Sequence, residues 1–159
     1  MSAAVNFFTS TFPGTLDAKG RVCIPADYRV ALTTQNTAGV YLRLSHLDSS
    51  IEGFGEEKMQ RLLASQAAQD PVFGTDVDDT VRLMLRSTQL LPRDENGRVR
   101  LPESYIAHAA LTDRVIFTGE GASFYLWAPE AYEAMHDEEL KRARALHAAR
   151  RAARMGGGA

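Results

Sequence analysis

A twelve-residue motif occurs twice in this chain of 159 residues, at residues 17–28 and again at residues 94–105. Six of the twelve positions are identical at a fixed offset of 77 residues. Chance is a poor explanation for agreement of this density, so the chain is an internal duplication. Neither half is long enough to bury a core well, and we expect the two halves to pack together or interlock. The identical pairs are Asp17/Asp94, Gly20/Gly97, Arg21/Arg98, Val22/Val99, Pro25/Pro102 and Tyr28/Tyr105.

Each copy of the motif begins with a predicted tight turn. Gly20 and Gly97 supply the positive backbone φ that other residues resist. Asp17 and Asp94 open the turns, where a short carboxylate can accept hydrogen bonds from backbone N–H groups. With the proline that ends each copy's strand, these residues form the predicted structural motif: Asp17, Gly20, Pro25, Asp94, Gly97 and Pro102.

A short strand should follow each turn, because apolar and polar residues alternate there. The apolar positions are expected to face the core: Val22, Ile24, Val99 and Leu101. The positions between them should face the other way: Arg21, Cys23, Arg98 and Arg100. The prolines suit the first position of helices predicted at residues 26–32 and 103–111. On these helices we expect the buried pairs Tyr28/Leu32 and Ile106/Ala110.

The similarity of the two halves continues more faintly beyond the motif. Apolar segments at residues 40–44 and 50–54 correspond to segments at residues 115–118 and 123–127, and a helix should follow each pair. Those helices are predicted at 56–68 and 129–154, with a further helix at 78–86 and a strand at 85–91. The predicted class is α+β, mainly antiparallel, with peripheral helices. We divide the chain into repeat 1 (7–56), a helical connector (57–82), repeat 2 (83–132) and a basic C-terminal helix and tail (133–159).

Composition points to a cytoplasmic protein. No apolar run approaches the roughly 20 residues of a membrane span, and the first residues lack the pattern of a signal peptide. With the single cysteine Cys23, neither an intrachain disulfide nor a cysteine-based zinc site is expected. The net charge of −2 argues against coating nucleic acid by bulk electrostatics, yet it allows a local basic patch.

The charge is unevenly placed along the chain. Six Lys or Arg residues and no acid lie between Lys141 and Arg154, whereas residues 52–79 are mainly acidic. The basic tail has two interpretations that the sequence leaves open. It is either a solvated, fraying terminal helix or an arm that binds DNA.

Catalytic chemistry is not expected. Residues 76–80 match the Asp-x-Asp-x-Thr pattern of haloacid-dehalogenase phosphatases, but the preceding segment is too short and broken for the required strand, so we interpret the acids as a helix cap. The sequence contains no phosphate-binding glycine loop. We therefore predict neither metal, cofactor nor small-molecule substrate. The four histidines lack ligand spacing: His46, His108, His136 and His147.

The repeated Gly-Arg-Val-x-[Ile/Leu]-Pro, preceded by Asp, resembles the SpoVT/AbrB superfamily of swapped-hairpin β barrels that bind DNA. Two copies in one short chain are similar to the MraZ family, and so is the later pattern formed by Gly119, Gly121, Phe124, Leu126 and Trp127. The resemblance implies two pseudo-symmetric swapped-hairpin units packed as one barrel-like body. It also implies a ring-like homo-oligomer that binds repeated promoter boxes and regulates the division and cell-wall gene cluster, and repression is the expected sign of that regulation.

The resemblance places DNA recognition at the turns, with double-stranded DNA and further copies of the chain as partners. Arginine can read guanine in the major groove, while lysine mainly neutralises phosphate. Only the first copy carries lysine beside Gly-Arg, so it is the better candidate reader. The alternative for the arginines is a structural ion pair with Asp17 or Asp94, and the alternative function is an oligomeric scaffold or antitoxin-like protein-binding module. The predicted DNA-binding residues are Lys19, Arg21, Arg98 and Arg100.

Overall fold

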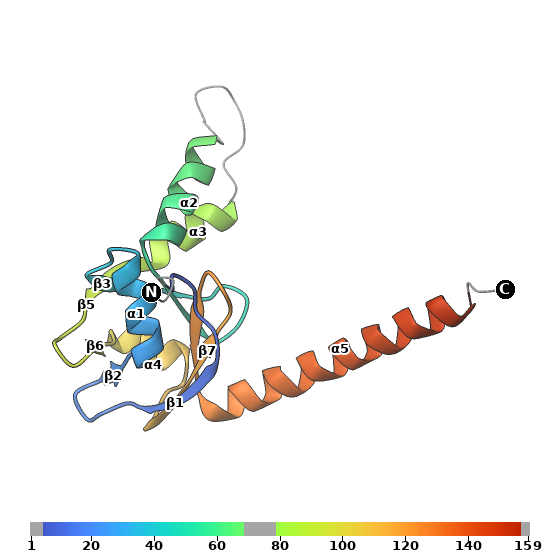
Figure 1. The fold of residues 1–159 in the computed structure, drawn as a ribbon. Helices are drawn as coiled ribbons and strands as arrows, with labels where there is room; N and C mark the ends of the chain where they lie inside the picture. Colours follow the sequence, from blue (N-terminus) through green and yellow to red (C-terminus); the bar gives the residue numbers. More distant parts are fainter. Residues whose placement is uncertain (1–4, 69–78, 157–159) are drawn as a thin grey trace. The chain divides into compact units, whose positions relative to one another are not determined.

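The computed structural model describes residues 5–68 and 79–156. It divides into two compact units, Met1–Ala128 and Pro129–Ala159, which are described separately (Figure 1). Helix α3 (Asp79–Ser87) begins inside the phosphatase-like pattern, whose residues 76–78 lie outside the described part.

The first unit is built on a six-stranded antiparallel sheet with the order β1-β7-β8-β4-β3-β5. The first half of the chain contributes β1 (Thr11–Thr15), β3 (Gly39–Leu44) and β4 (Ile51–Phe54). The second half contributes β5 (Thr88–Pro92), β7 (Arg114–Gly119) and β8 (Phe124–Trp127). The two motif strands, β2 (Arg21–Cys23) and β6 (Arg98–Arg100), form a separate two-stranded sheet.

Strands of the two halves are interleaved throughout this unit. In the large sheet β1 pairs with β7, β4 with β8, and β3 with β5, so each of these pairs joins one half to the other. The register places Thr11 opposite Thr118 and Gly39 opposite Pro92. The predicted interlocking of the halves is therefore confirmed.

The expected α+β class is confirmed, but the closed, barrel-like body is not. Among the described residues β1 pairs in the large sheet only with β7, and β5 only with β3, so both are edge strands. A single bridge between Leu16 and Val22 leads from β1 toward the small sheet without closing it. The open sheet also gives no confirmation that the two repeats are pseudo-symmetric units.

The motif helices begin directly after the prolines. Pro25 and Pro102 are the N-caps of α1 (Ala26–Thr34) and α4 (Glu103–His108), one position earlier than predicted. Their carbonyl oxygens accept the first helical hydrogen bonds, from the Arg29 and Ile106 N–H groups at 3.0 and 3.2 Å. Tyr28 and Leu32 are buried as expected.

The buried pair predicted on the second motif helix is wrong. Ile106 is half-buried and Ala110 is exposed, whereas Tyr105 and Ala109 are buried. The helix ends at His108, and Ala110 has a φ of +51°, which turns it away from the buried face of the helix. The buried pair is therefore Tyr105 and Ala109, one residue earlier than predicted, and it corresponds to Tyr28 and Leu32 in the first half.

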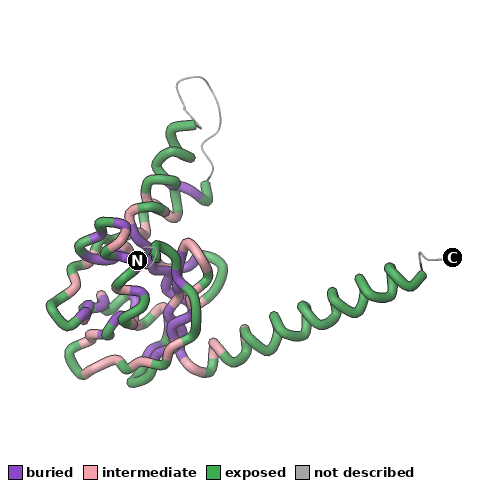
Figure 2. Tube along the Cα trace, viewed as in Figure 1, coloured by how far each residue is buried: buried purple, intermediate pink, exposed green. Residues whose placement is uncertain are grey.

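Aromatic residues from both halves form the centre of the core. Phe8, Tyr28, Phe117 and Phe124 are buried, and Phe8 lies edge-on to Tyr28 with ring centroids 5.6 Å apart. The Tyr28 hydroxyl donates to the Ser10 carbonyl at 2.7 Å, which satisfies its polar end. Figure 2 shows the buried positions gathered in the first unit, with none along the C-terminal helix.

A buried ion cluster ties four elements together around Glu52, which is fully buried on β4. Arg43 lies opposite it on β3 and donates to Oε1 at 2.5 Å, while Lys58 of α2 (Glu56–Ala68) and Ser123, just before β8, donate to Oε2. Burial opposes ionisation, but the hydrogen bonds from Lys58 and Ser123 and the charges of Lys58 and Arg43 hold the pKa of Glu52 below its ordinary value. The carboxylate thus stays charged inside the fold.

Helices α2 and α3 lie side by side at one end of the first unit (Figure 1). The second unit is helix α5 (Pro129–Gly156), which has no buried residue. Across residues 5–68 and 79–156, none of the helices combines the length and the apolar character that crossing a membrane requires.

Candidate nucleic-acid interface

The two motif turns have the same hydrogen-bonding geometry. Asp17 Oδ1 accepts the backbone N–H groups of Lys19 and Arg21, each at 2.9 Å. Asp94 Oδ1 accepts those of Asn96 and Arg98 at the same distances. Hydrogen bonding by the backbone of the motif arginine, with further support from its side chain, lowers the pKa of each aspartate. Both aspartates therefore build their turns as predicted.

Each motif arginine also forms the ion pair that the sequence left open as an alternative. Arg21 Nε lies 2.8 Å from Asp17 Oδ2, and Arg98 Nε lies 2.8 Å from Asp94 Oδ2. The arginine side chains remain 27% and 39% exposed. Only Nε takes part in the pairing, so the aspartate orients the guanidinium while its terminal nitrogens keep donor capacity.

The small sheet brings the predicted DNA-binding arginines onto one surface. β2 and β6 run antiparallel, with Arg21 opposite Arg100, Val22 opposite Val99 and Cys23 opposite Arg98. Both valines are buried, so the arginines and the cysteine share the outward face. We call this face the arginine ribbon, defined by Arg21, Cys23, Arg98 and Arg100.

Lys19 borders the arginine ribbon, because Arg100 Nε donates to the Lys19 carbonyl at 3.2 Å. Each turn is also held by the other half's strand: Leu101 N–H donates to the Gly20 carbonyl at 2.8 Å, and Ile24 N–H to the Gly97 carbonyl at 2.9 Å. All four predicted DNA-binding residues therefore belong to one composite surface, to which both halves contribute.

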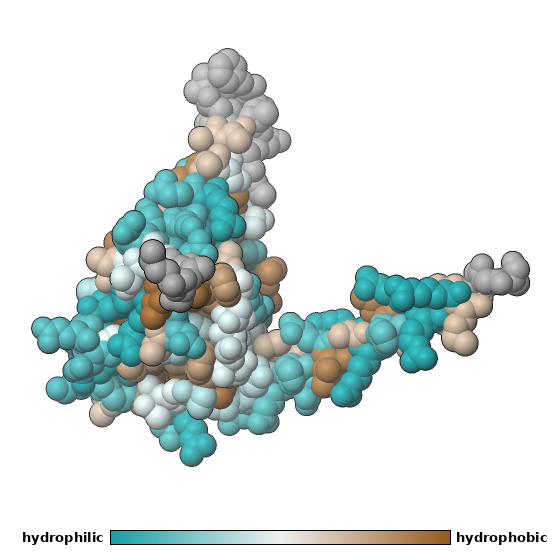
Figure 3. Space-filling view, viewed as in Figure 1, coloured by the Kyte–Doolittle hydropathy of each residue, from teal (hydrophilic) through white to brown (hydrophobic). Residues whose placement is uncertain are grey.

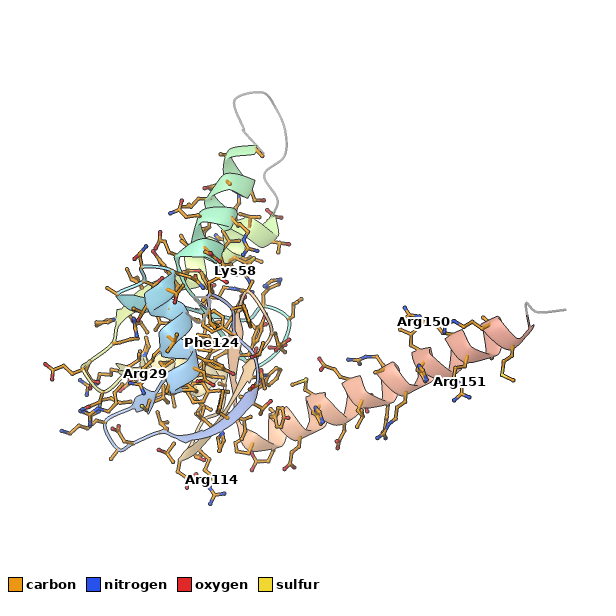
Figure 4. All side chains as sticks on the ribbon, viewed as in Figure 1. Arg29, Lys58, Arg114, Phe124, Arg150 and Arg151 are labelled. Carbon is orange, nitrogen blue, oxygen red and sulfur yellow. The ribbon has the colours of Figure 1, made fainter. Side chains whose placement is uncertain are left out.

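Arg29 is a basic residue of this region that the sequence analysis missed. It extends from α1 toward the second turn, where Nη1 donates to the Asn96 carbonyl at 3.4 Å (Figure 4). Burial and the nearby charge of Arg29 lower the pKa of the Arg93 guanidinium, so two cations are held close together. The signal lay one residue beyond the motif, where the second half has Ile106 at the equivalent position.

Arg29 contacts only the second of the two turns, and this difference can be measured by replacing the glycine of each turn with alanine. Gly20 and Gly97 have φ values of +77° and +78°, so alanine at either position should destabilise the fold by about 1–2 kcal/mol. A Cβ at Gly20 would lie 3.5 Å from Ile106, whereas one at Gly97 would lie 2.3 Å from Arg29 Cδ. Gly97→Ala should therefore lower the urea midpoint further than Gly20→Ala.

The control for this comparison is the same pair of variants in an Arg29→Ala background. Removing the obstructing side chain should bring the two midpoints together, as a double-mutant cycle requires of a direct contact. Equal midpoints in the wild-type background would contradict the asymmetry.

The histidines do not assemble into a ligand set. His108 Nε2 lies 3.2 Å from the Ser50 carbonyl, and His46 Nδ1 lies 3.5 Å from Arg43 Nη1. Within the described part of the chain, no group of three or more His, Cys, Asp or Glu side chains is placed to hold a metal ion. The exposed thiol of Cys23 lies 3.3 Å from the Asn96 carbonyl.

Comparison with known proteins gives matches along most of the chain. A family model described as "MraZ protein, putative antitoxin-like" matches residues 84–155. A Gluconobacter oxydans protein named transcriptional regulator MraZ is 40% identical over 152 residues, which cover 94% of this chain and 92% of the relative. Relatives of the same name in Gluconacetobacter diazotrophicus and Azorhizobium caulinodans are 36% and 34% identical, over 96% and 87% of this chain and 98% and 88% of their own lengths.

Proposed function

Since this chain belongs to the MraZ family, we propose that it is a sequence-specific, DNA-binding transcriptional regulator without enzymatic activity. The proposal includes repression of the division and cell-wall gene cluster and a place in the cytoplasm, at the nucleoid. The names of the relatives support the regulatory role. The specific partner is argued from the arginine ribbon.

The observation that carries the proposal is the position of Arg21 directly opposite Arg100 on the outward face of β2 and β6. Asp17 already balances the charge of Arg21, whereas Arg100 has no acidic partner among the described residues, and an external anion would supply one. A two-stranded ribbon fits the major groove of B-DNA, where a guanidinium can donate two hydrogen bonds to guanine. Duplex DNA therefore matches both the shape and the charge of the ribbon.

Within this surface we assign different roles to the two turns. Arg21 reads a base while Lys19 neutralises phosphate, and Asp17 fixes the direction of the guanidinium. Arg98 and Arg100 make secondary contacts, because the second turn carries Asn96 in place of lysine. The structural and reading roles of the motif arginine combine in one side chain.

A single ribbon offers few charged contacts, and such a site binds weakly at physiological salt. We propose that several copies assemble into a ring and engage repeated promoter boxes, which raises the apparent affinity without a new type of contact. In this proposal residues 7–56 and 83–132 are pseudo-symmetric swapped-hairpin units of a barrel-like body, joined by the connector 57–82 and followed by the basic tail 133–159.

The test is a binding titration with a duplex from upstream of the chain's own gene and a shuffled duplex of the same length and composition. We expect the upstream duplex to bind roughly a thousandfold more tightly or better, with affinity falling steeply as salt rises. Equal binding of the two duplexes would contradict sequence-specific recognition.

The second candidate is an oligomeric scaffold or antitoxin-like protein-binding module. It is favoured by the description of the matching family model, which includes the words antitoxin-like. In that case a protein partner would cover the turn that carries exposed Lys19. Equal binding of both duplexes, together with protection of the Lys19 amine from chemical labelling in the assembled protein, would favour this candidate.

A further inference from the structure

Helix α5 is divided by charge into two halves. Residues 129–140 contain five acids and no Lys or Arg, whereas residues 141–154 contain six Lys or Arg and no acid. Acids near the N-terminus and cations near the C-terminus suit the helix dipole, but the dipole acts only within the first and last turns. The dipole therefore does not account for cations spread over 14 residues.

Three of these arginines line up along one side of the helix, together with a histidine. Arg144, His147, Arg151 and Arg154 follow one another at spacings of three, four and three residues, which places them on one face. We call this face the basic ridge. It extends roughly 15 Å along the helix axis. The opposite side carries smaller apolar residues with one leucine and one arginine: Ala149, Ala153, Leu146 and Arg142.

The arginines of the basic ridge are exposed and have no acidic partner within residues 129–156. Lys141 differs, because its Nζ lies 3.7 Å from Glu138 Oε1. The neighbouring Arg150 and Arg151 extend away from the helix toward different sides (Figure 4). The ridge thus presents guanidinium groups that are free to meet an external anion.

We propose that the basic ridge of α5 binds the phosphate backbone of DNA beside the boxes read by the arginine ribbon. This inference rests on the proposed function and deepens it by adding a second, sequence-independent contact. Guanidinium groups pair well with phosphate oxygens, and such contacts add affinity without adding base specificity. The acidic first half of α5 is repelled by DNA, so the contact is confined to residues 141–154.

Two other partners fit the helix less well. A membrane-surface helix needs several large apolar residues opposite its charges, whereas this one has only Leu146 among alanines within residues 141–154, and its surface is largely hydrophilic (Figure 3). Pairing with a second copy as a coiled coil needs an apolar seam. The seam that starts at Tyr132 and Met135 continues with Glu139 and Arg142, so charges interrupt it.

The test compares the salt dependence of DNA binding by the full-length chain and a ridge variant, Arg144→Gln/Arg151→Gln/Arg154→Gln. Glutamine has nearly the helix propensity of arginine, so α5 should stay helical, as far-UV circular dichroism can verify. The slope of log K against log salt is negative, and each lost phosphate contact makes it shallower by about 0.9. The wild type should therefore lose roughly 40-fold more affinity than the ridge variant between 50 and 200 mM salt for each engaged subunit.

A matched control, Arg61→Gln/Arg82→Gln/Arg86→Gln, removes three exposed arginines from α2 and α3 and should keep the wild-type slope. Measurements on both the upstream and the shuffled duplex separate the two proposals. A reduced slope on both, with an unchanged preference between them, supports the ridge contact. A wild-type slope in the ridge variant overturns it, whether or not the upstream duplex is preferred.

The wild type and the ridge variant also test the two alternative partners, a second copy of the chain and an anionic membrane. If the ridge substitutions change sedimentation or binding to anionic vesicles while leaving the DNA slope as in the wild type, the ridge contacts a second copy or a membrane, and the DNA proposal is overturned.

Discussion

Replacing Arg21 with alanine should weaken binding to the specific duplex by roughly 5- to 150-fold for each engaged subunit, the equivalent of one lost bidentate contact to guanine. Asp17 holds Arg21 Nε at 2.8 Å, so the terminal nitrogens are presented in a fixed direction. Truncation removes those donors and leaves Asp17 unpaired beside the DNA. Anisotropy titration at one fixed salt concentration measures the loss.

Arg98→Ala is the matched control, because Arg98 has the same ion pair at the same distance but lacks a neighbouring lysine. It should weaken binding less. Arg21→Lys keeps the charge without the planar fork, so it should retain affinity for shuffled DNA while losing preference for the specific duplex. Because partly exposed ion pairs contribute little to the free energy of unfolding, all three variants should stay folded. Unchanged specific affinity in Arg21→Ala would rule out the assignment.

Glu52→Gln should lower the free energy of unfolding by about 3–5 kcal/mol, because it leaves the buried Arg43 without a counter-charge. Arg43 is 6% exposed and Glu52 is fully buried, so water cannot replace the lost interaction. The substitution also weakens the connection between β3, β4, α2 and the segment before β8. Urea unfolding at pH 7 measures the difference.

The pH dependence of this effect has a definite sign. The pKa of Glu52 is lowered by folding, so its charge stabilises the fold above the ordinary value of 4.5, and that contribution is lost as pH falls through the folded pKa. The difference between wild type and Glu52→Gln should therefore shrink below pH 4.5. The exposed Glu103→Gln is the control and should cost less than about 1 kcal/mol. A small, pH-independent effect of Glu52→Gln would contradict a structural role for the cluster.

Local features of the motif were predictable from the sequence because they depend on neighbouring residues. Glycine at a positive φ, aspartate accepting backbone N–H groups and alternation along a strand all act within a few residues. The burial of Val22 and Val99 and the geometry of Gly20 and Gly97 follow those expectations. The helix end at His108 was missed because no proline or glycine marks it.

Contacts between the halves could not be derived in the same way. The register that places Arg21 opposite Arg100 depends on how two distant strands meet, and periodicity alone does not specify it. Glu52 lies in an apolar segment where its partners Arg43 and Lys58 become visible only when β3, β4 and α2 are assembled. Whether the arginines touch DNA stays a prediction.

The pairing of β2 with β6 also determines when the arginine ribbon can first exist. Its strands join Arg21 to Arg100, residues separated by most of the first unit. While the chain is being made on the ribosome, β2 has no partner until β6 has emerged, and closing so long a loop slows folding. A half-made chain therefore carries a turn with Lys19 and Arg21 but no completed ribbon, so competence to read DNA arises late in synthesis and all at once.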